Sequence, residues 1–153
     1  MRSYADRAGA AKKADNAEHD GPWYDYIWDV MLANPGEITA DFKAAGRSGI
    51  EGTFHESAVV FGPRDQLYVG EGAEIHPCGG VDTRNGPVTL EADVEVHPFT
   101  RIEGPCYVGR KAILLGAKVR EGCSIGPMCR VGGEVEESIL HGYSNKYHDG
   151  FLG

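Results

Sequence analysis

The sequence has no long hydrophobic run, no cluster of basic residues and no Cys-x-x-Cys pair. A membrane-spanning helix needs about 20 apolar residues in succession, and the apolar segments here, such as AILLGA, are much shorter. The formal net charge is −8, which argues against nucleic acid as the main partner. We therefore expect a chain that neither enters a membrane nor binds nucleic acid.

The four cysteines do not have the spacing of a zinc ribbon or of a redox motif. Cys106, Cys123 and Cys129 fall on an inward position of the repeat described next, and Cys78 lies one residue before that position. A buried thiol behaves as a small hydrophobic group, and free thiols persist in a reducing compartment. We expect small, buried, unpaired cysteines and a cytoplasmic location.

Glycine, in contrast, is abundant, with 22 of the 153 residues, and it belongs to a six-residue repeat. Each repeat is expected to form one short strand and one turn, and three repeats close a triangular coil that stacks on the next as parallel strands. Glycine after the apolar residue, as in Val69-Gly70 and Val108-Gly109, is expected to provide positive φ angles in the turns. The apolar positions are Val60, Val69, Ile75, Val81, Leu90, Val96, Ile102, Val108, Val119, Ile125, Val131 and Leu140.

The repeat is interrupted at a few points and then regains its phase. The nine-residue steps from Val60 to Val69 and from Val81 to Leu90 lie 21 residues apart. Their inserts, PRDQ and TRNGP, are predicted to protrude at the same corner of adjacent coils. A third insert is predicted between Val131 and Leu140, one corner further round. A deletion of one residue after Val108 would place Ile113 at the apolar position and Ala117 at the small one.

The chain divides into three predicted regions. Residues 1–21 have no apolar periodicity and are predicted to be a flexible leader or linker. Residues 22–47 carry an apolar stripe at helical spacing, and Asn34-Pro35 is expected to end a first short helix and open a second. Residues 50–153 are predicted to form the repeat domain, an all-β solenoid.

His55, His76 and His97 follow apolar positions at intervals of 21 residues, which predicts a column on adjacent coils about 4.8 Å apart. Imidazole columns can bind zinc, which makes a metalloenzyme a third hypothesis for the function. The following prolines also fit turn entries, and we predict no metal site. Arg101, Lys118 and Glu136 form a second column, interpreted as a solvated face.

Residues 143–149 break the repeat with seven successive polar, aromatic or titratable residues. Such a departure from the local pattern is where a functional site is expected, although a hydrophilic loop is the simpler alternative. His148 is the candidate general base, since a histidine can take a proton from an amine near neutral pH. Lys146 and Asn145 are the candidates to hold phosphate and sugar hydroxyls.

The helical segment PWYDYIWDVMLANPGEITADF, the repeats, and the segment IGPMCRVGGEVEESILHGYSNKYHDGFLG together carry a resemblance to a known family. They resemble the bifunctional sugar-1-phosphate nucleotidyltransferase/acetyltransferases, which combine N-acetylglucosamine-1-phosphate uridyltransferase with glucosamine-1-phosphate N-acetyltransferase. The spacing S-x-x-x-H-x-x-[FY]-L-G, from Ser144 through His148 and Phe151 to Gly153, is the most specific part.

The resemblance implies a left-handed parallel β-helix that transfers acetyl from acetyl-CoA to an amino-sugar 1-phosphate. It places the general base on His148 and a phosphate-binding or nucleotide-binding role on Arg130. Tyr143, Asn145, Lys146 and Phe151 are further substrate-binding candidates from the sequence around the motif. It implies a homotrimer with active sites between subunits, and Mg²⁺ only where a nucleotidyltransferase domain accompanies the β-helix.

Some residues depart from the family pattern and keep a second hypothesis open. Phe151 replaces a tyrosine, and the acidic segment EVEESIL has no match for a family lysine. The chain also stops inside a repeat, so we expect a domain cut at its carboxyl end. The alternative function is a non-catalytic trimerisation or regulatory module of a sugar-1-phosphate nucleotidyltransferase.

Overall fold

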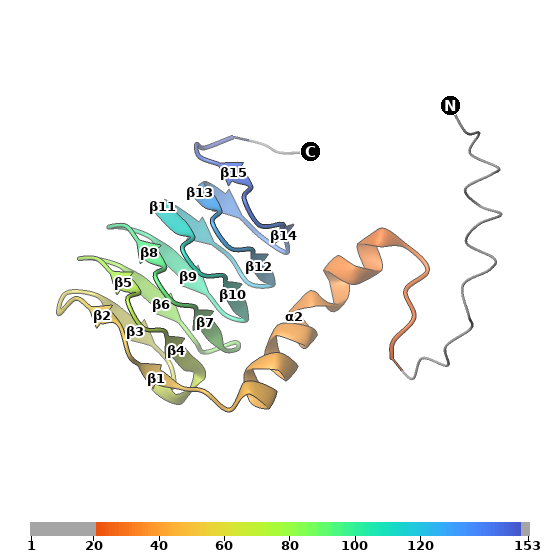
Figure 1. The fold of residues 1–153 in the computed structure, drawn as a ribbon, viewed down its shortest axis with the longest axis horizontal. Helices are drawn as coiled ribbons and strands as arrows, with labels where there is room; N and C mark the ends of the chain where they lie inside the picture. Colours follow the sequence, from red (N-terminus) through yellow and green to blue (C-terminus); the bar gives the residue numbers. More distant parts are fainter. Residues whose placement is uncertain (1–20, 151–153) are drawn as a thin grey trace.

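A computed structural model describes residues 21–150 of the chain, which form a parallel β-solenoid preceded by one helix (Figure 1). The predicted fold class is therefore confirmed. The predicted leader, residues 1–21, lies outside the described residues except for Gly21. No helix in the described part of the chain is long and apolar enough to cross a membrane.

The first face of the solenoid is a six-stranded parallel sheet. Each of its strands is short, because a strand has only two or three residues before the chain turns to the next face. The strands, in order, are β1 (Gly49–Ile50), β4 (Leu67–Val69), β7 (Val88–Leu90), β10 (Cys106–Val108), β12 (Cys123–Ile125) and β14 (Ile139–Leu140).

The second and third faces are separate in the first three coils and become continuous in the next two. There, single strands run round the corner and belong to both faces. The second face contains β2 (Thr53–Phe54), β5 (Glu74–Ile75), β8 (Glu95–Val96) and β15 (Asn145–Lys146). The third face contains β3 (Val59–Phe61), β6 (Gly80–Asp82) and β9 (Arg101–Glu103), and both share β11 (Ile113–Val119) and β13 (Arg130–Val135).

The core is a continuous column of apolar side chains inside the coils. The predicted apolar positions from Val69 to Val131 are almost completely buried, as are the small residues that follow them, such as Ala73 and Ala112. Burial of one such Val, Leu or Ile side chain stabilises the fold by roughly 1.5–3 kcal/mol. The six-residue periodicity therefore identified the core correctly.

Two predicted positions of the repeat were wrong because the chain shortens at a corner. Leu114, not Ile113, pairs with Val96 and Val131 and is fully buried, so the deleted residue lies between Leu114 and Ala117. The register of β11 and β13 shifts at this point. Val135 then pairs with Val119, so the predicted insert between Val131 and Leu140 does not exist and that coil is shorter instead.

The same register shift changes the predicted charged column, in which Glu134 rather than Glu136 lies beside Lys118.

The two earlier inserts were predicted correctly. PRDQ contains the short 3₁₀ helix η1 (Arg64–Gln66), and it follows β3 as TRNGP follows β6, so both protrude between the third and first faces of adjacent coils. Thr83 joins them by donating a 2.8 Å hydrogen bond to the Pro63 carbonyl.

The glycines after the apolar positions have a different role from the one predicted. Gly109 and Gly126 do not have positive φ, and the turns instead place residues such as Asp93, Lys111 and Met128 in the left-handed region. A Cβ on Gly109 would lie 2.7 Å from the Pro127 nitrogen, and one on Gly126 would overlap the backbone of Gly142. These glycines are therefore needed for the close approach of consecutive coils.

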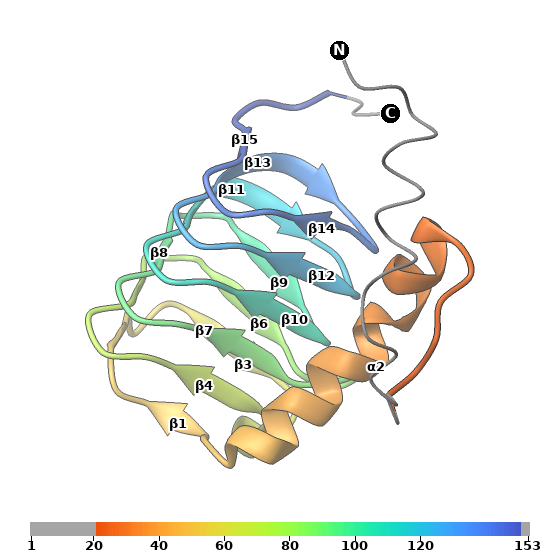
Figure 2. The same ribbon diagram turned by 45° about the vertical axis from the view of Figure 1, so that its right-hand side comes forward.

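One helix, α2 (Ile27–Ala45), replaces the two predicted short helices. The Asp29 carboxylate accepts the Tyr26 amide hydrogen at its start, and Gly46, with φ of 60°, ends it. Pro35 lies inside the helix without ending it. Asn34 explains this, because its side chain donates to the Gly122 carbonyl at 2.8 Å and accepts from the Ser124 hydroxyl at 2.8 Å. These contacts hold α2 against the first face (Figure 2).

The cysteines are unpaired, and three of the four are buried. Burial raises the pKa of the Cys106 thiol well above its ordinary value, and burial raises that of Cys123 to about 11. Cys78 is exposed at a turn, which corrects the expectation that all four are buried. Its backbone has φ of 60°, so the turn directs this side chain away from the core.

Candidate functional site

The polar segment 143–149 extends the second face of the solenoid at its last described coil. Asn145 lies directly beside Arg130 in the register of β15 and β13, and the Arg130 amide donates to the Ser144 carbonyl at 3.0 Å. Both side chains are exposed on the outer side of the face. The structure therefore brings together two of the predicted substrate-binding residues, a guanidinium and an amide.

Lys146 occupies an apolar position of the repeat, but its ammonium group is held by backbone oxygens. The Nζ atom donates to the Gly132 carbonyl at 2.9 Å and to the His148 carbonyl at 3.1 Å. Its side chain thus fixes the segment around His148 to the preceding coil. This contact uses two of the three ammonium hydrogens.

His148 is exposed, and the edge of its ring contacts Tyr147, with the ring centroids 5.0 Å apart. Within residues 21–150 its imidazole has no hydrogen-bond partner. Tyr143 is 81% exposed and has left-handed backbone angles, which turn its ring away from the coil. Phe151, the remaining predicted substrate-binding residue, lies outside the described residues.

A hollow of about 880 Å³ opens beside this last coil. It is lined by apolar residues at the start of α2 and by the strand ends around β14, and Lys146 reaches it. Glu134, Glu136 and Glu137 also line it, and Arg120 lies 3.3 Å from the carboxylate of Glu134 and 3.9 Å from that of Glu136. The hollow is acidic overall, which disfavours a phosphate there.

The same face carries a second polar group two coils earlier, and here the histidine column was predicted correctly. His76 and His97 stack with ring centroids 5.3 Å apart and planes 9° from parallel. The Nε2 atom of His97 lies 3.1 Å from the Glu95 carboxylate, and that of His76 lies 3.5 Å from Glu74. His55, the third member, instead bonds Ser57 at 3.0 Å.

The glutamate partners were missed from the sequence, although a signal was present. Glu74-Ile75-His76 and Glu95-Val96-His97 repeat one pattern 21 residues apart. Residues on either side of an inward side chain both point outward, so each glutamate lies beside its histidine. Among the described residues, no group of three or more His, Cys, Asp or Glu side chains is arranged to hold a metal ion.

Coil four separates the two polar groups on this face. Ile113 and Leu115 occupy the outward positions between Glu95 and Arg130 in the register of the sheet. Along this face, the glutamate–histidine pairs of coils two and three come first. The apolar side chains of coil four follow, and Arg130, Asn145 and His148 lie on the last two coils.

Comparison with known proteins gives sequence relatives for most of the chain. It is 32% identical to "Bifunctional protein GlmU" of Acidovorax sp. (strain JS42) and equally to that of Acidovorax ebreus (strain TPSY), over 138 residues in each case. The match covers 81% of this chain but spans only 27% of the length of those relatives. No protein-family profile matches the chain.

The solved structures that match the chain include the H141N mutant of perosamine N-acetyltransferase from Caulobacter crescentus, in complex with CoA and GDP-perosamine. The sequence identity is 22%, the TM-score is 0.42, and the match covers 74% of this chain and 59% of that one.

Proposed function

We propose, from the relationship of this chain to the bifunctional hexapeptide-repeat transferases, that it is the β-solenoid part of an acetyltransferase acting on an amino-sugar 1-phosphate. The acyl donor is acetyl-CoA. The observation that supports the proposal is the segment 143–149, which breaks the repeat, carries the motif spacing of Ser144 and His148, and lies on an open face. The protein works as a homotrimer with sites between neighbouring subunits.

The chemistry assigned to His148 is removal of one proton. The amine nitrogen attacks the thioester carbonyl, a C–N bond forms, the C–S bond breaks, and the amine proton passes to the imidazole. The CoA thiolate leaves and is protonated. Because His148 is exposed and its imidazole has no hydrogen-bond partner within residues 21–150, a substrate amine has access to it.

Arg130 and Asn145 are the substrate-binding groups of the proposal. A guanidinium binds phosphate oxygens with two parallel hydrogen bonds, and the neighbouring amide offers both a donor and an acceptor to sugar hydroxyls. Tyr143 and Phe151 provide aromatic contact. Lys146 acts by holding the segment through its two carbonyl contacts, since most of its donors are already used.

The test is acetyl transfer from acetyl-CoA to glucosamine-1-phosphate, measured with wild type, His148→Ala and His97→Ala. Loss of a general base lowers the rate roughly 100- to 10,000-fold, and the fall is expected for His148→Ala alone. A rate unchanged by His148→Ala would exclude this base. Loss with His97→Ala instead would move the base to His97 and its partner Glu95.

A second function is favoured by the acidic hollow beside the last coil. Three carboxylates line this hollow and disfavour a sugar phosphate there, as expected of a non-catalytic trimerisation or regulatory module of a nucleotidyltransferase. Native mass spectrometry together with the acetyl-transfer assay separates the two functions. A trimer without transferase activity toward any aminosugar phosphate supports the module, and activity supports the enzyme.

A further inference from the structure

Four large apolar side chains at the start of α2 are exposed. Trp23 is 88% exposed and Ile27 is 86% exposed. Tyr26 and Trp28 stack with their ring centroids 4.6 Å apart, yet each remains more than half exposed. Exposed apolar residues that gather in one place, unlike single ones, mark a site of interaction. We call these four residues the helix-start patch.

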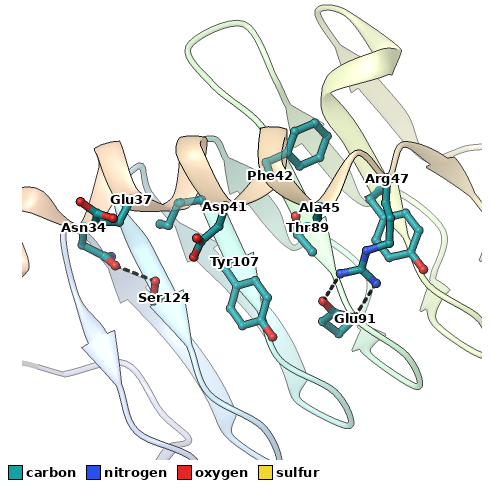
Figure 3. A pocket seen from close by; sticks show the side chains of 12 residues that line it. Asn34, Glu37, Asp41, Phe42, Ala45, Arg47, Thr89, Glu91, Tyr107 and Ser124 are labelled. Carbon is teal, nitrogen blue, oxygen red and sulfur yellow. Dashed lines mark hydrogen bonds and ion pairs between the residues drawn. The ribbon is translucent and has the colours of Figure 1, made fainter. Parts of the chain in front are cut away.

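The attachment of α2 places this patch at one edge of the first face. Asn34 bonds Gly122 and Ser124, the second of which Figure 3 shows, and Gly122 lies where the chain enters the first face in the fifth coil. Ile27 lies two turns before Asn34 and lines the hollow beside β14. The start of α2 therefore lies beside the last coils and extends away from them (Figures 1 and 2).

A second exposed surface lies at the other edge of the first face, where the chain leaves it for the second face. Lys111, Met128 and Tyr143 each follow a strand of the first face at the same distance, so they form a column on coils four to six. All three have left-handed backbone angles, and Met128 is 43% and Tyr143 81% exposed. Arg110, beside Lys111, is also exposed. We call these four residues the corner patch.

The two patches have opposite charges. Asp25 and Asp29 lie within the helix-start patch, whereas the side chains of Arg110 and Lys111 have no ion pair within residues 21–150. Asp93 precedes Lys111 in the same column, so the basic part of the corner begins at coil four. A cation over an indole or phenol ring is attracted to it, and Trp, Tyr, Met and Arg are the residue types enriched at protein interfaces. The patches therefore fit each other, although they lie at opposite edges of one chain.

We propose that the helix-start patch of one chain docks on the corner patch of a second copy, and that three such contacts close a ring. The number of copies rests on the proposed function. Two different surfaces that bind each other close a ring when the copies are related by rotation alone, which requires both surfaces at the same height along the axis. For an axis along the solenoid both patches meet this condition, because both lie beside the last coils.

The contact also completes the candidate acetyl-transfer site. Tyr143 belongs to the corner patch and is followed directly by β15, where Asn145 lies beside Arg130. Aromatic side chains from the neighbouring chain therefore cover the edge of the site that adjoins the first face. The site is open at this edge in a single chain and closed in the ring.

The contact can be followed in the wild-type protein by fluorescence. The chain has two tryptophans, and both belong to the helix-start patch. Sedimentation velocity and tryptophan emission are measured on one dilution series of the full chain, and the emission should move to longer wavelength as the trimer dissociates. A chain that is monomeric at every concentration, or a trimer that dissociates without a change in emission, would overturn the proposal.

Trp23→Ala tests the helix-start patch and should raise the concentration of half-dissociation at least about tenfold. The matched control is Phe99→Ala, because Phe99 is 77% exposed at the corner after the second face, away from both patches. The control should leave dissociation unchanged, and equal effects of the two variants would contradict the contact.

Charge reversal tests the pairing of the two patches. Asp25→Lys and Lys111→Asp each bring like charges together and should raise the same concentration roughly tenfold. The double variant restores opposite charges and should return to within about threefold of wild type. Aspartate tolerates the left-handed angles at position 111, and thermal unfolding checks that each variant is folded. A double variant that associates no better than the single variants would contradict the pairing.

The outcomes separate this contact from the proposed function. A ring that forms through these patches but transfers no acetyl group would contradict the proposed function alone. Acetyl transfer by a trimer that Trp23→Ala leaves intact would contradict the contact alone.

Discussion

The first and second faces of the solenoid are built from the same repeat but meet their surroundings differently. The first face is covered by α2, which binds Ser124 through Asn34 and leaves a cleft over Thr89 and Tyr107. Over the second face no helix lies within the described residues, and polar side chains such as His97 and Glu95 pair with each other instead.

This difference shows what the repeat determines and what it leaves free. The inward residues fix the stacking of the coils and are alike on both faces, since Leu90 and Val96 are both buried in the same core. The outward residues are not constrained by the core. They became a helix-docking surface with a cavity on one face and an open polar surface on the other.

The largest effect is expected from Gly126→Ala, at the corner that both faces share. The new methyl group would overlap the backbone of Gly142 in the next coil, and a backbone cannot rotate away as a side chain can. We expect a loss of about 3 kcal/mol in the free energy of unfolding, measured by urea denaturation.

The matched control is Gly36→Ala on α2, where the added methyl group meets no atom within 4 Å. Alanine in a helix interior should stabilise by about 0.5–1 kcal/mol, the opposite sign. Equal effects of the two substitutions would contradict the role given to the corner glycines.

A smaller effect, confined to the first face, is expected from Asn34→Ala. The substitution removes both hydrogen bonds from α2 to the sheet and leaves the Gly122 carbonyl without its donor, at a cost of about 1–2 kcal/mol. Hydrogen exchange should increase in α2 while the amides of the second face, such as His97, stay protected. An equal increase in hydrogen exchange on both faces would mean that α2 does not detach separately from the solenoid.

The smallest effect is expected from alkylation of the cysteines in the wild-type protein. Burial raises the pKa of Cys123, inside the first face, to about 11, and burial also raises that of Cys106 well above its ordinary value, so neither thiolate is available at neutral pH. Cys78, exposed at the corner after the second face, should react alone in the native protein. Mass spectrometry should find one label per native chain and four after unfolding, and native labelling of Cys123 would contradict the burial described here.

The sequence predicted the core because the six-residue periodicity directly reflects inward-pointing side chains. It failed where the chain shortens, since either Ile113 or Leu114 satisfies the apolar pattern and only pairing with Val96 decides between them. It failed at Pro35 for a different reason. Local preference favoured a helix end there, whereas contacts of Asn34 with residues 88 and 90 positions away keep the helix continuous.

The candidate sites were predicted only in part, for the same reason. Residues 143–149 stand out locally, so His148 and its neighbours could be proposed as a site from the sequence. That the ammonium of Lys146 is bound by two carbonyls depends on the preceding coil. The cavity between α2 and the first face is lined by both Asp41 and Tyr107, and no local pattern indicates that these two residues share it.

The attachment of Asn34 to Gly122 and Ser124 also has a consequence for the order of folding. The helix precedes the solenoid in the chain, yet its two anchoring hydrogen bonds close loops of 88 and 90 residues. Such distant contacts form slowly, because the loop entropy is lost before the contact is gained. A growing chain therefore makes α2 early but docks it only when the fifth coil has stacked, so docking of the helix reports that coil and not the earlier ones.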